Sequence, residues 1–196
     1  GSLTIGKTKL SGPSNDQVFV AKLNSSGTAQ WAKSAVCDNK GMSIAGFIAA
    51  DANGNVYVSG WYARDYNDWT ITKDPTKIDF GNNITLTYSS TEGSHNYITK
   101  YNSSGTAQWA KKITGSNIGT PILSKMFVSA NNNLFMLFNA TGDYNIAGTN
   151  YNAALRTFLI TELNSSGNIT IIKPKAVNSG TISGMLCPTS GGFIVS

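Results

Sequence analysis

A ten-residue phrase occurs twice in this chain without a single change. Residues 24–33 read Asn-Ser-Ser-Gly-Thr-Ala-Gln-Trp-Ala-Lys, and residues 102–111 repeat them letter for letter. A third copy at residues 164–170 keeps Asn-Ser-Ser-Gly and then diverges. Identity over this length indicates an internal repeat, and a repeat of this size constrains the fold more strongly than local propensities do.

Each copy of the phrase predicts one β-hairpin. A strand rich in apolar residues precedes the Asn-Ser-Ser-Gly turn, and a strand carrying Trp follows it in the first two copies. The glycine of each turn supplies the positive φ that such a turn usually needs. A Trp that recurs at one hairpin position indicates packing between repeats rather than a ligand platform. The residues with these structural roles are Gly27, Gly105, Gly167, Trp31 and Trp109.

A second, more apolar hairpin alternates with the first. It comprises residues 44–50 and 56–62, and similar pairs follow near residues 126–138 and 185–196. Residues 44–50 show no alternation of apolar and polar side chains, which predicts a strand buried on both faces. Each repeat therefore contains four strands in two hairpins. The turns of the first hairpin type are 78 and then 62 residues apart (102 − 24 and 164 − 102), and the difference falls in a polar connection.

Repeated four-stranded antiparallel units predict an all-β protein built from β-propeller blades. We expect the end of a blade at residues 1–34, blades at 42–113 and 122–173, and the start of a blade at 181–196. A stacked β-solenoid is the competing architecture, and the tight hairpin turns disfavour it. Two full and two partial blades cannot close a ring of about four to eight blades. We therefore expect the rest of the propeller to come from the same polypeptide rather than from several chains.

Residues 19–27 followed by Trp31, together with residues 51–60, resemble the SBBP-type β-propeller repeats of bacterial secreted proteins. The connection between the hairpins resembles repeats of Bacteroidetes surface proteins. The third repeat departs from the pattern near Ile171, where Trp is replaced, and at residues 131–133, which lack Asp and Gly. The resemblance implies an extracellular or cell-surface protein. It carries no family-wide catalytic residues and so implies neither an enzyme nor a cofactor.

Composition and charge limit the classes of molecule that this chain is expected to bind. Only 13% of residues are charged, against roughly 25% in typical globular domains, which favours a turn-rich secreted β protein. The net charge is +5, but the basic residues are scattered, so we expect no nucleic-acid partner. No apolar run is long enough to span a bilayer, so we expect no membrane insertion. The two cysteines, Cys37 and Cys187, favour unpaired or buried thiols, although a bridge between them stays open.

The best candidate for ligand binding follows the second strand of the apolar hairpin. Aromatic side chains there could stack on sugar rings or anchor a protein partner, while acidic and basic neighbours supply hydrogen bonds. The alternative is a loop whose aromatic rings cover the neighbouring blade. The third repeat lacks this segment. The candidate residues are Tyr62, Arg64, Asp65, Tyr66, Asp68 and Trp69.

A calcium site is a weaker candidate. Asp51, Asn53 and Asn55 place oxygen atoms at alternate positions, as the start of a calcium loop does. The equivalent turns of later repeats lose the carboxylate, which favours an ordinary turn, and we expect no metal. His95 is the only histidine, stands in a loop, and has no Gly-x-Ser-x-Gly nucleophile to serve.

These observations predict a non-catalytic extracellular or cell-surface module that binds a glycan or a protein, or that mediates adhesion. One alternative is a structural spacer in a large surface protein. Another is a non-catalytic piece of a propeller hydrolase or lyase. No cofactor is expected. Any function should reside where the repeats differ, at residues 62–80.

Overall fold

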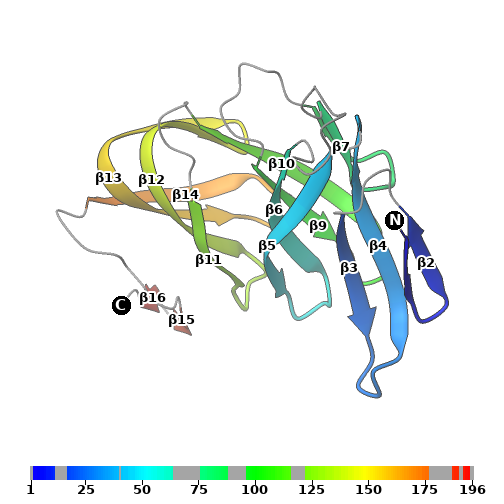
Figure 1. Cartoon of the computed structure of the whole chain (residues 1–196). Coiled ribbons are helices and arrows are strands. Elements are labelled where there is room, and N and C mark those ends of the chain that lie inside the picture. The colour runs from blue at the N-terminus through cyan, green and yellow to red at the C-terminus, as the bar shows by residue number, and fades with distance from the viewer. Residues whose placement is uncertain are drawn as a thin grey trace.

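The computed structural model describes residues 2–11, 17–39, 41–63, 76–87, 96–115, 122–176, 187–189 and 192–194. These residues form β-strands and turns, and every strand pair is antiparallel, so the expectation of an all-β chain is confirmed (Figure 1). Within the described ranges, no helix is long and apolar enough to cross a membrane.

The first repeat is represented by one hairpin of the Asn-Ser-Ser-Gly type. Its strands β3 and β4 pair across the turn at residues 24–27. A small separate hairpin precedes it and contacts β4. The strands are β1 (Ser2–Ile5), β2 (Thr8–Ser11), β3 (Val18–Leu23) and β4 (Ala29–Cys37).

The second repeat is a four-stranded antiparallel meander in the order β5-β6-β9-β10. A short hairpin, β7-β8, branches out between β6 and β9. Its strand β7 pairs with β4 of the first repeat rather than with its own sheet. The strands are β5 (Met42–Ala50), β6 (Val56–Ala63), β7 (Lys77–Asp79), β8 (Thr85–Thr87), β9 (Asn96–Tyr101) and β10 (Ala107–Gly115).

The third repeat is a second four-stranded meander, in the order β11-β12-β13-β14. Beyond it lies a small hairpin, β15-β16, near the C-terminus (Figure 1). The strands are β11 (Ile122–Val128), β12 (Leu134–Ile146), β13 (Thr149–Leu163), β14 (Ile169–Ala176), β15 (Cys187–Thr189) and β16 (Gly192–Ile194).

Strand β5 corrects one expectation from the sequence. Its residues 44–50 were expected to be buried on both faces, yet Ile44 is 37% and Ile48 is 63% exposed. The reason is position: among the described strands, β5 is the last of its sheet and has a hydrogen-bonded neighbour, β6, on one side only. The doubly buried strand is β6, whose residues 56–60 are all buried. An apolar run alone cannot tell an inner strand from an edge strand.

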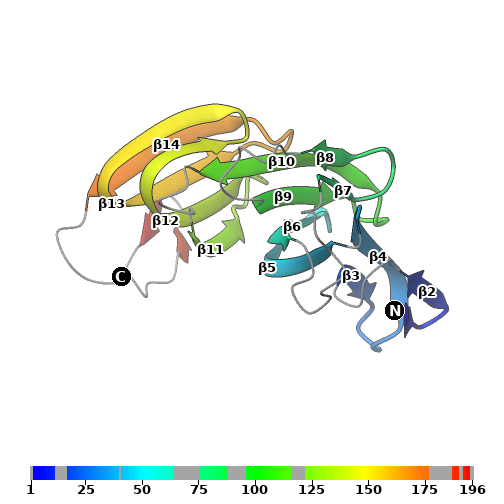
Figure 2. The same ribbon diagram turned by 45° about the horizontal axis from the view of Figure 1, so that its top comes forward.

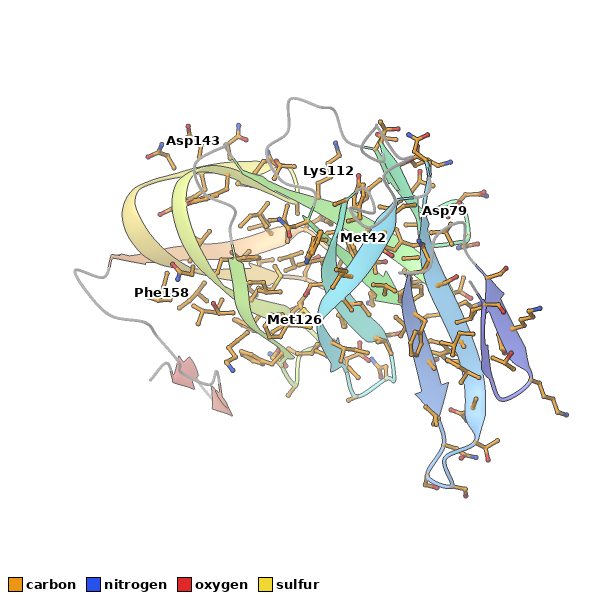
Figure 3. The ribbon with its side chains drawn as sticks, viewed as in Figure 1. Met42, Asp79, Lys112, Met126, Asp143 and Phe158 are labelled. Carbon is orange, nitrogen blue, oxygen red and sulfur yellow. The ribbon has the colours of Figure 1, made fainter. Side chains whose placement is uncertain are left out.

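The second repeat is a layer with apolar packing on both faces. Alternate residues of one strand point to opposite sides, and in β6 this sends Val58 to one hydrophobic core and Tyr57 to another. The first core is shared with the first repeat through residues such as Val20 and Cys37. The second is shared with the third repeat through Met136 and Leu159. Figure 3 shows side chains filling the spaces between the successive sheets.

Consecutive repeats are also joined at the end of their sheets by hydrogen-bonded strands. Strand β7 of the second repeat pairs with the end of β4. In the same way, the end of β12 in the third repeat pairs with the end of β10. Figure 2 shows the continuous curved layer that this second connection creates from β10 to β14. A strand from each repeat thus covers part of the outer edge of the repeat before it, which limits edge pairing with other molecules.

Candidate functional site

The repeated phrase forms a contact between repeats, which we call the inter-repeat joint. The indole N–H of Trp31 donates a hydrogen bond of 2.9 Å to the carbonyl oxygen of Ser103, in the turn of the second repeat. The Trp31 ring also lies 6.5 Å from the ring of Tyr101, the residue that precedes that turn. The side chain of one repeat therefore packs on the turn of the next.

The joint recurs one repeat further along. The indole N–H of Trp109 donates to the carbonyl oxygen of Ser165 at 3.0 Å, in the turn of the third repeat. Leu163, which precedes this turn, is fully buried in the core against which Trp109 packs. Both joints thus use the same donor and the same turn position, and both lie between repeats, where the sequence led us to expect the Trp side chains.

A lysine completes each joint. Lys22 lies directly opposite Trp31 in the register of β3 and β4, and Lys100 lies opposite Trp109 in β9 and β10. The ammonium of Lys100 donates to the Ser165 carbonyl at 3.0 Å, and that of Lys22 approaches the Ser103 carbonyl at 3.4 Å. A carbonyl oxygen has two lone pairs, so one oxygen can accept from both partners of the cross-strand pair.

The turn glycines are required by this contact as well as by the backbone. Gly105 has φ +78°, and a Cβ built on it would lie 2.6 Å from the Trp31 ring. Gly167 has φ +77°, and its Cβ would lie 2.9 Å from the Trp109 ring. The predicted positive φ is confirmed at these glycines. The absence of a side chain is what lets the indole approach the turn.

The Asn at the start of each turn fixes its shape. The Oδ1 atom of Asn102 accepts the backbone N–H groups of Ser104 and Thr106, at 3.0 and 2.9 Å. Asn24 and Asn164 accept the equivalent N–H groups in their own turns. Such side-chain acceptance stabilises a tight turn, so the carbonyl that receives Trp and Lys is held in a defined direction.

Asp51, the calcium candidate, occupies the same role in the apolar hairpin. Its Oδ1 accepts the N–H groups of Asn53 and Asn55, at 3.0 and 2.9 Å, and its Oδ2 accepts from the Asn55 side chain at 2.7 Å. The carboxylate is thus engaged as a turn acceptor. Among the described residues, no group of three or more His, Cys, Asp or Glu side chains could hold a metal ion.

Lys100 links this turn to the joint. Its ammonium lies 5.2 Å from the centre of the Tyr57 ring, which is a cation–π arrangement. Burial lowers the pKa of Lys100, and the nearby Asp51 carboxylate partly opposes that effect. Burial also raises the pKa of Tyr57 to about 12, with Asp51 adding to the shift. The cluster is a buried polar network that supports the joint.

The aromatic binding candidate is only partly within the described residues. Tyr62 is 1% exposed and belongs to the core shared with the first repeat, so its ring is not available to stack on a ligand. Arg64, Asp65, Tyr66, Asp68 and Trp69 lie outside the described residues, as does His95. Their role as a binding segment stays a prediction.

Both flanks of that segment are held firmly. Ala63 ends β6 and pairs with Met42. On the other side, the backbone N–H of Thr76 donates to Asp38 Oδ1 at 2.8 Å and its hydroxyl donates to Asp38 Oδ2 at 2.9 Å. The N–H of Lys77 also donates to Asp38 Oδ1, at 3.1 Å. Residues 64–75 therefore begin and end at fixed points of the sheet framework.

Cys37 is a free, buried thiol, in agreement with the interpretation that the sequence favoured over a bridge. Its Sγ–H donates to the Met42 carbonyl at 3.5 Å. Burial is the main reason that its pKa rises from 9.0 to about 12, and the neighbouring Asp38 carboxylate adds to this effect. The thiol is therefore protonated and unreactive at neutral pH.

The sequence did not reveal the lysine half of the joint. In the sequence, Lys22 and Lys100 are only two of the scattered basic residues, yet Lys100 is 8% exposed in the structure. Two features of the sequence could have indicated their role: their fixed distance before the turn and their position opposite Trp in the hairpin.

No protein-family model matches this chain. No curated protein matches it either.

Proposed function

We propose that this chain is a non-catalytic module of β-propeller blades that displays a binding segment at a cell surface. The recurrence of the inter-repeat joint carries the proposal, because Trp31 and Trp109 contact equivalent turns of successive repeats. Equivalent joints hold each antiparallel repeat against the next in the same way, as the packing of successive propeller blades requires. The blade interpretation, the resemblance to SBBP-type repeats and the surface location rest on the sequence pattern and belong to the proposal.

The binding segment is residues 64–75, for which Tyr66 and Trp69 supply aromatic faces. Arg64, Asp65 and Asp68 supply hydrogen-bonding groups. Binding residues commonly lie on loops that a rigid scaffold positions. The fixed flanks at Ala63 and Thr76 provide such a scaffold here. The ligand class is a glycan or a surface protein, since both are recognised by aromatic stacking combined with polar contacts.

The test compares wild-type protein with Trp69→Ala on a glycan array and on immobilised extracellular proteins. Trp61→Ala is the matched control, because Trp61 is 38% exposed but lies on β6 outside the segment. We expect Trp69→Ala to lose binding while Trp61→Ala keeps it, with both variants folded by circular dichroism. Equal binding by wild type and Trp69→Ala would remove the segment from the proposal.

A structural spacer is the second candidate function. The burial of Tyr62 favours it, because one aromatic residue next to the segment serves the core rather than a ligand. A spacer predicts that wild-type protein binds nothing on either array. The two candidates are thus separated by the wild-type measurement alone.

A further inference from the structure

The turn of the first repeat has the same sequence and geometry as the two turns that receive Trp. We use the term acceptor turn for the four-residue turn and the residue before it: 23–27, 101–105 and 163–167. Gly27 has φ +77°, against +78° and +77° in the other two copies. The Gly27 N–H donates to the Asn24 carbonyl at 2.9 Å, the same distance as in both other turns.

The surroundings of this acceptor turn differ from those of the others. Leu23 is 53% exposed, whereas the equivalent Tyr101 and Leu163 are 1% and 0% exposed. A Cβ built on Gly27 would meet no described atom within 4 Å, whereas one on Gly105 would collide with Trp31. The first acceptor turn is therefore formed but not covered within the described part of the chain.

Resting on the blade architecture proposed above, we propose that acceptor turn 23–27 is the docking site for a further repeat hairpin of the same polypeptide, one that carries a cross-strand Lys–Trp pair. The Ser25 carbonyl occupies the position of Ser103 and Ser165, so it would accept the indole N–H and the ammonium together. Leu23 supplies the apolar floor, and Gly27 leaves room for the ring. The turn needs no rearrangement to bind, which keeps the ordering cost of association small.

A second copy of this chain does not fit the site. Both Lys–Trp pairs of the described chain are already engaged, Lys22–Trp31 on Ser103 and Lys100–Trp109 on Ser165. The third repeat has no such pair, because Glu162 and Ile171 occupy the two paired positions. Glu162 instead accepts a hydrogen bond of 2.6 Å from Asn133. The occupant must therefore bring its own Lys–Trp pair.

The probe is a hairpin peptide with the sequence of residues 97–112, closed by a disulfide between added terminal cysteines and checked for strand pairing by NMR. This peptide contains the Lys100–Trp109 pair. It is titrated into the isotope-labelled full chain, and the amide signals of residues 25–28 are followed. We expect these signals to shift with saturation, and a peptide carrying Trp109→Leu to bind roughly tenfold more weakly or not at all.

The matched variant of the full chain is Gly27→Asn. Asparagine adopts positive φ at several places in this chain, so the turn should persist, while its side chain would occupy the space that the indole needs. These positions are Asn39, Asn82, Asn83 and Asn132. We expect unchanged thermal unfolding and loss of peptide binding. Equal binding by Gly27→Asn, or by the Trp109→Leu peptide, would overturn the proposal.

A tethered version covers the case of weak binding by a free hairpin, since isolated hairpins are only marginally stable. The peptide is fused ahead of residue 1 through a Gly/Ser linker, which raises its effective concentration to about the millimolar range. We expect the added Trp to give a blue-shifted emission that Gly27→Asn abolishes. No change in the residue 25–28 signals of the tethered protein would refute the site. If wild-type protein formed dimers in which the amide signals of residues 23–27 shifted, the occupant of this surface would be a second copy of the chain instead.

Discussion

The indole of Trp31 reaches the carbonyl of Ser103 across 72 residues of sequence. This bond and its counterpart from Trp109 to Ser165 join successive repeats by the same atoms. Stability in repeat arrays is approximately the sum of the repeats and of the interfaces between neighbours. The joint is therefore the place where single substitutions should have the largest and most interpretable effects.

Replacing Trp109 with Leu should lower the free energy of unfolding by about 2–4 kcal/mol, because the core contact and the hydrogen bond to Ser165 are lost together. Trp61→Leu, at a 38% exposed position, should cost about 1 kcal/mol or less. Urea unfolding of both variants measures the difference. Equal losses of unfolding free energy in the two variants would show that the joint contributes no more to stability than an exposed position does.

Gly105→Ala and Gly27→Ala form a matched pair of substitutions. Both place alanine at φ near +77°, which costs roughly 1–2 kcal/mol. Only Gly105→Ala also forces Cβ against the Trp31 ring, at 2.6 Å, which should add about 1–3 kcal/mol. Denaturant unfolding gives the difference directly. The interpretation fails if the two variants lose the same stability.

Asp51→Ala should destabilise the protein by about 1–3 kcal/mol, because two turn N–H groups lose their acceptor. Asp51→Asn should cost only about 1 kcal/mol, because its Oδ1 can still accept both turn N–H groups, as that of Asn24 does, and only the hydrogen bond from the Asn55 side chain is lost. Thermal unfolding with calcium chloride or with EDTA should give one midpoint. A calcium-dependent rise that Asp51→Asn abolishes would instead support the cation site.

Lys100→Met should lower the free energy of unfolding by about 1–2 kcal/mol, since the Ser165 carbonyl loses a charged donor and Asp51 loses its cationic neighbour. Lys22→Met should change it by less than about 0.5 kcal/mol, because the Lys22 contact is longer, at 3.4 Å, and exposed. Unfolding curves at low and high salt test the pair. A larger loss at Lys22 would contradict the assigned geometry.

Cys37 predicts a decline in stability at alkaline pH. Its pKa is about 12 in the folded protein and 9.0 without burial, so the folded state retains the proton that the unfolded state releases. The contribution is fully present below pH 9 and is lost as the pH rises from 9 towards 12. Cys37→Ala should make this decline shallower without abolishing it, because Tyr57, whose pKa is also raised to about 12, contributes over the same range.

Thiol labelling provides an independent check on the same residue. In a Cys187→Ser background, Cys37 should react with a thiol reagent at pH 8 only after the protein is unfolded. Rapid labelling of the folded protein would contradict its burial.

The sequence was sufficient for the hairpins because their determinants are local. The Asn and Gly of each turn fix the chain reversal, and the backbone follows them at residues 24–27 and 102–105. It was insufficient for burial, as Ile48 shows, because exposure depends on whether a neighbouring strand lies alongside. The pairing of Asp79 with Val36 was equally invisible, since a strand that joins the preceding repeat leaves no local pattern.

The candidate site, too, was only partly predictable from the sequence. The recurrence of Trp31 and Trp109 indicated packing between repeats, but the atom that each indole contacts becomes known only from the three-dimensional structure. We assigned Tyr62 to a binding loop because it lies close to Arg64 in sequence, yet it belongs to strand β6, whose alternate residues enter the core. Neighbours in sequence on a strand point to opposite faces, and this separates Tyr62 from the segment that follows.

The third copy of the repeated phrase diverges directly after its turn. Residues 164–167 still receive Trp109, and they are unchanged. Residues 168 onward correspond to the strand that would carry a Trp to a following repeat, and there the likeness ends. Each phrase has a receiving half, the turn, and a giving half, the Trp strand, and the third copy keeps only the receiving half. The second copy uses both halves, because its turn receives Trp31 and its strand supplies Trp109.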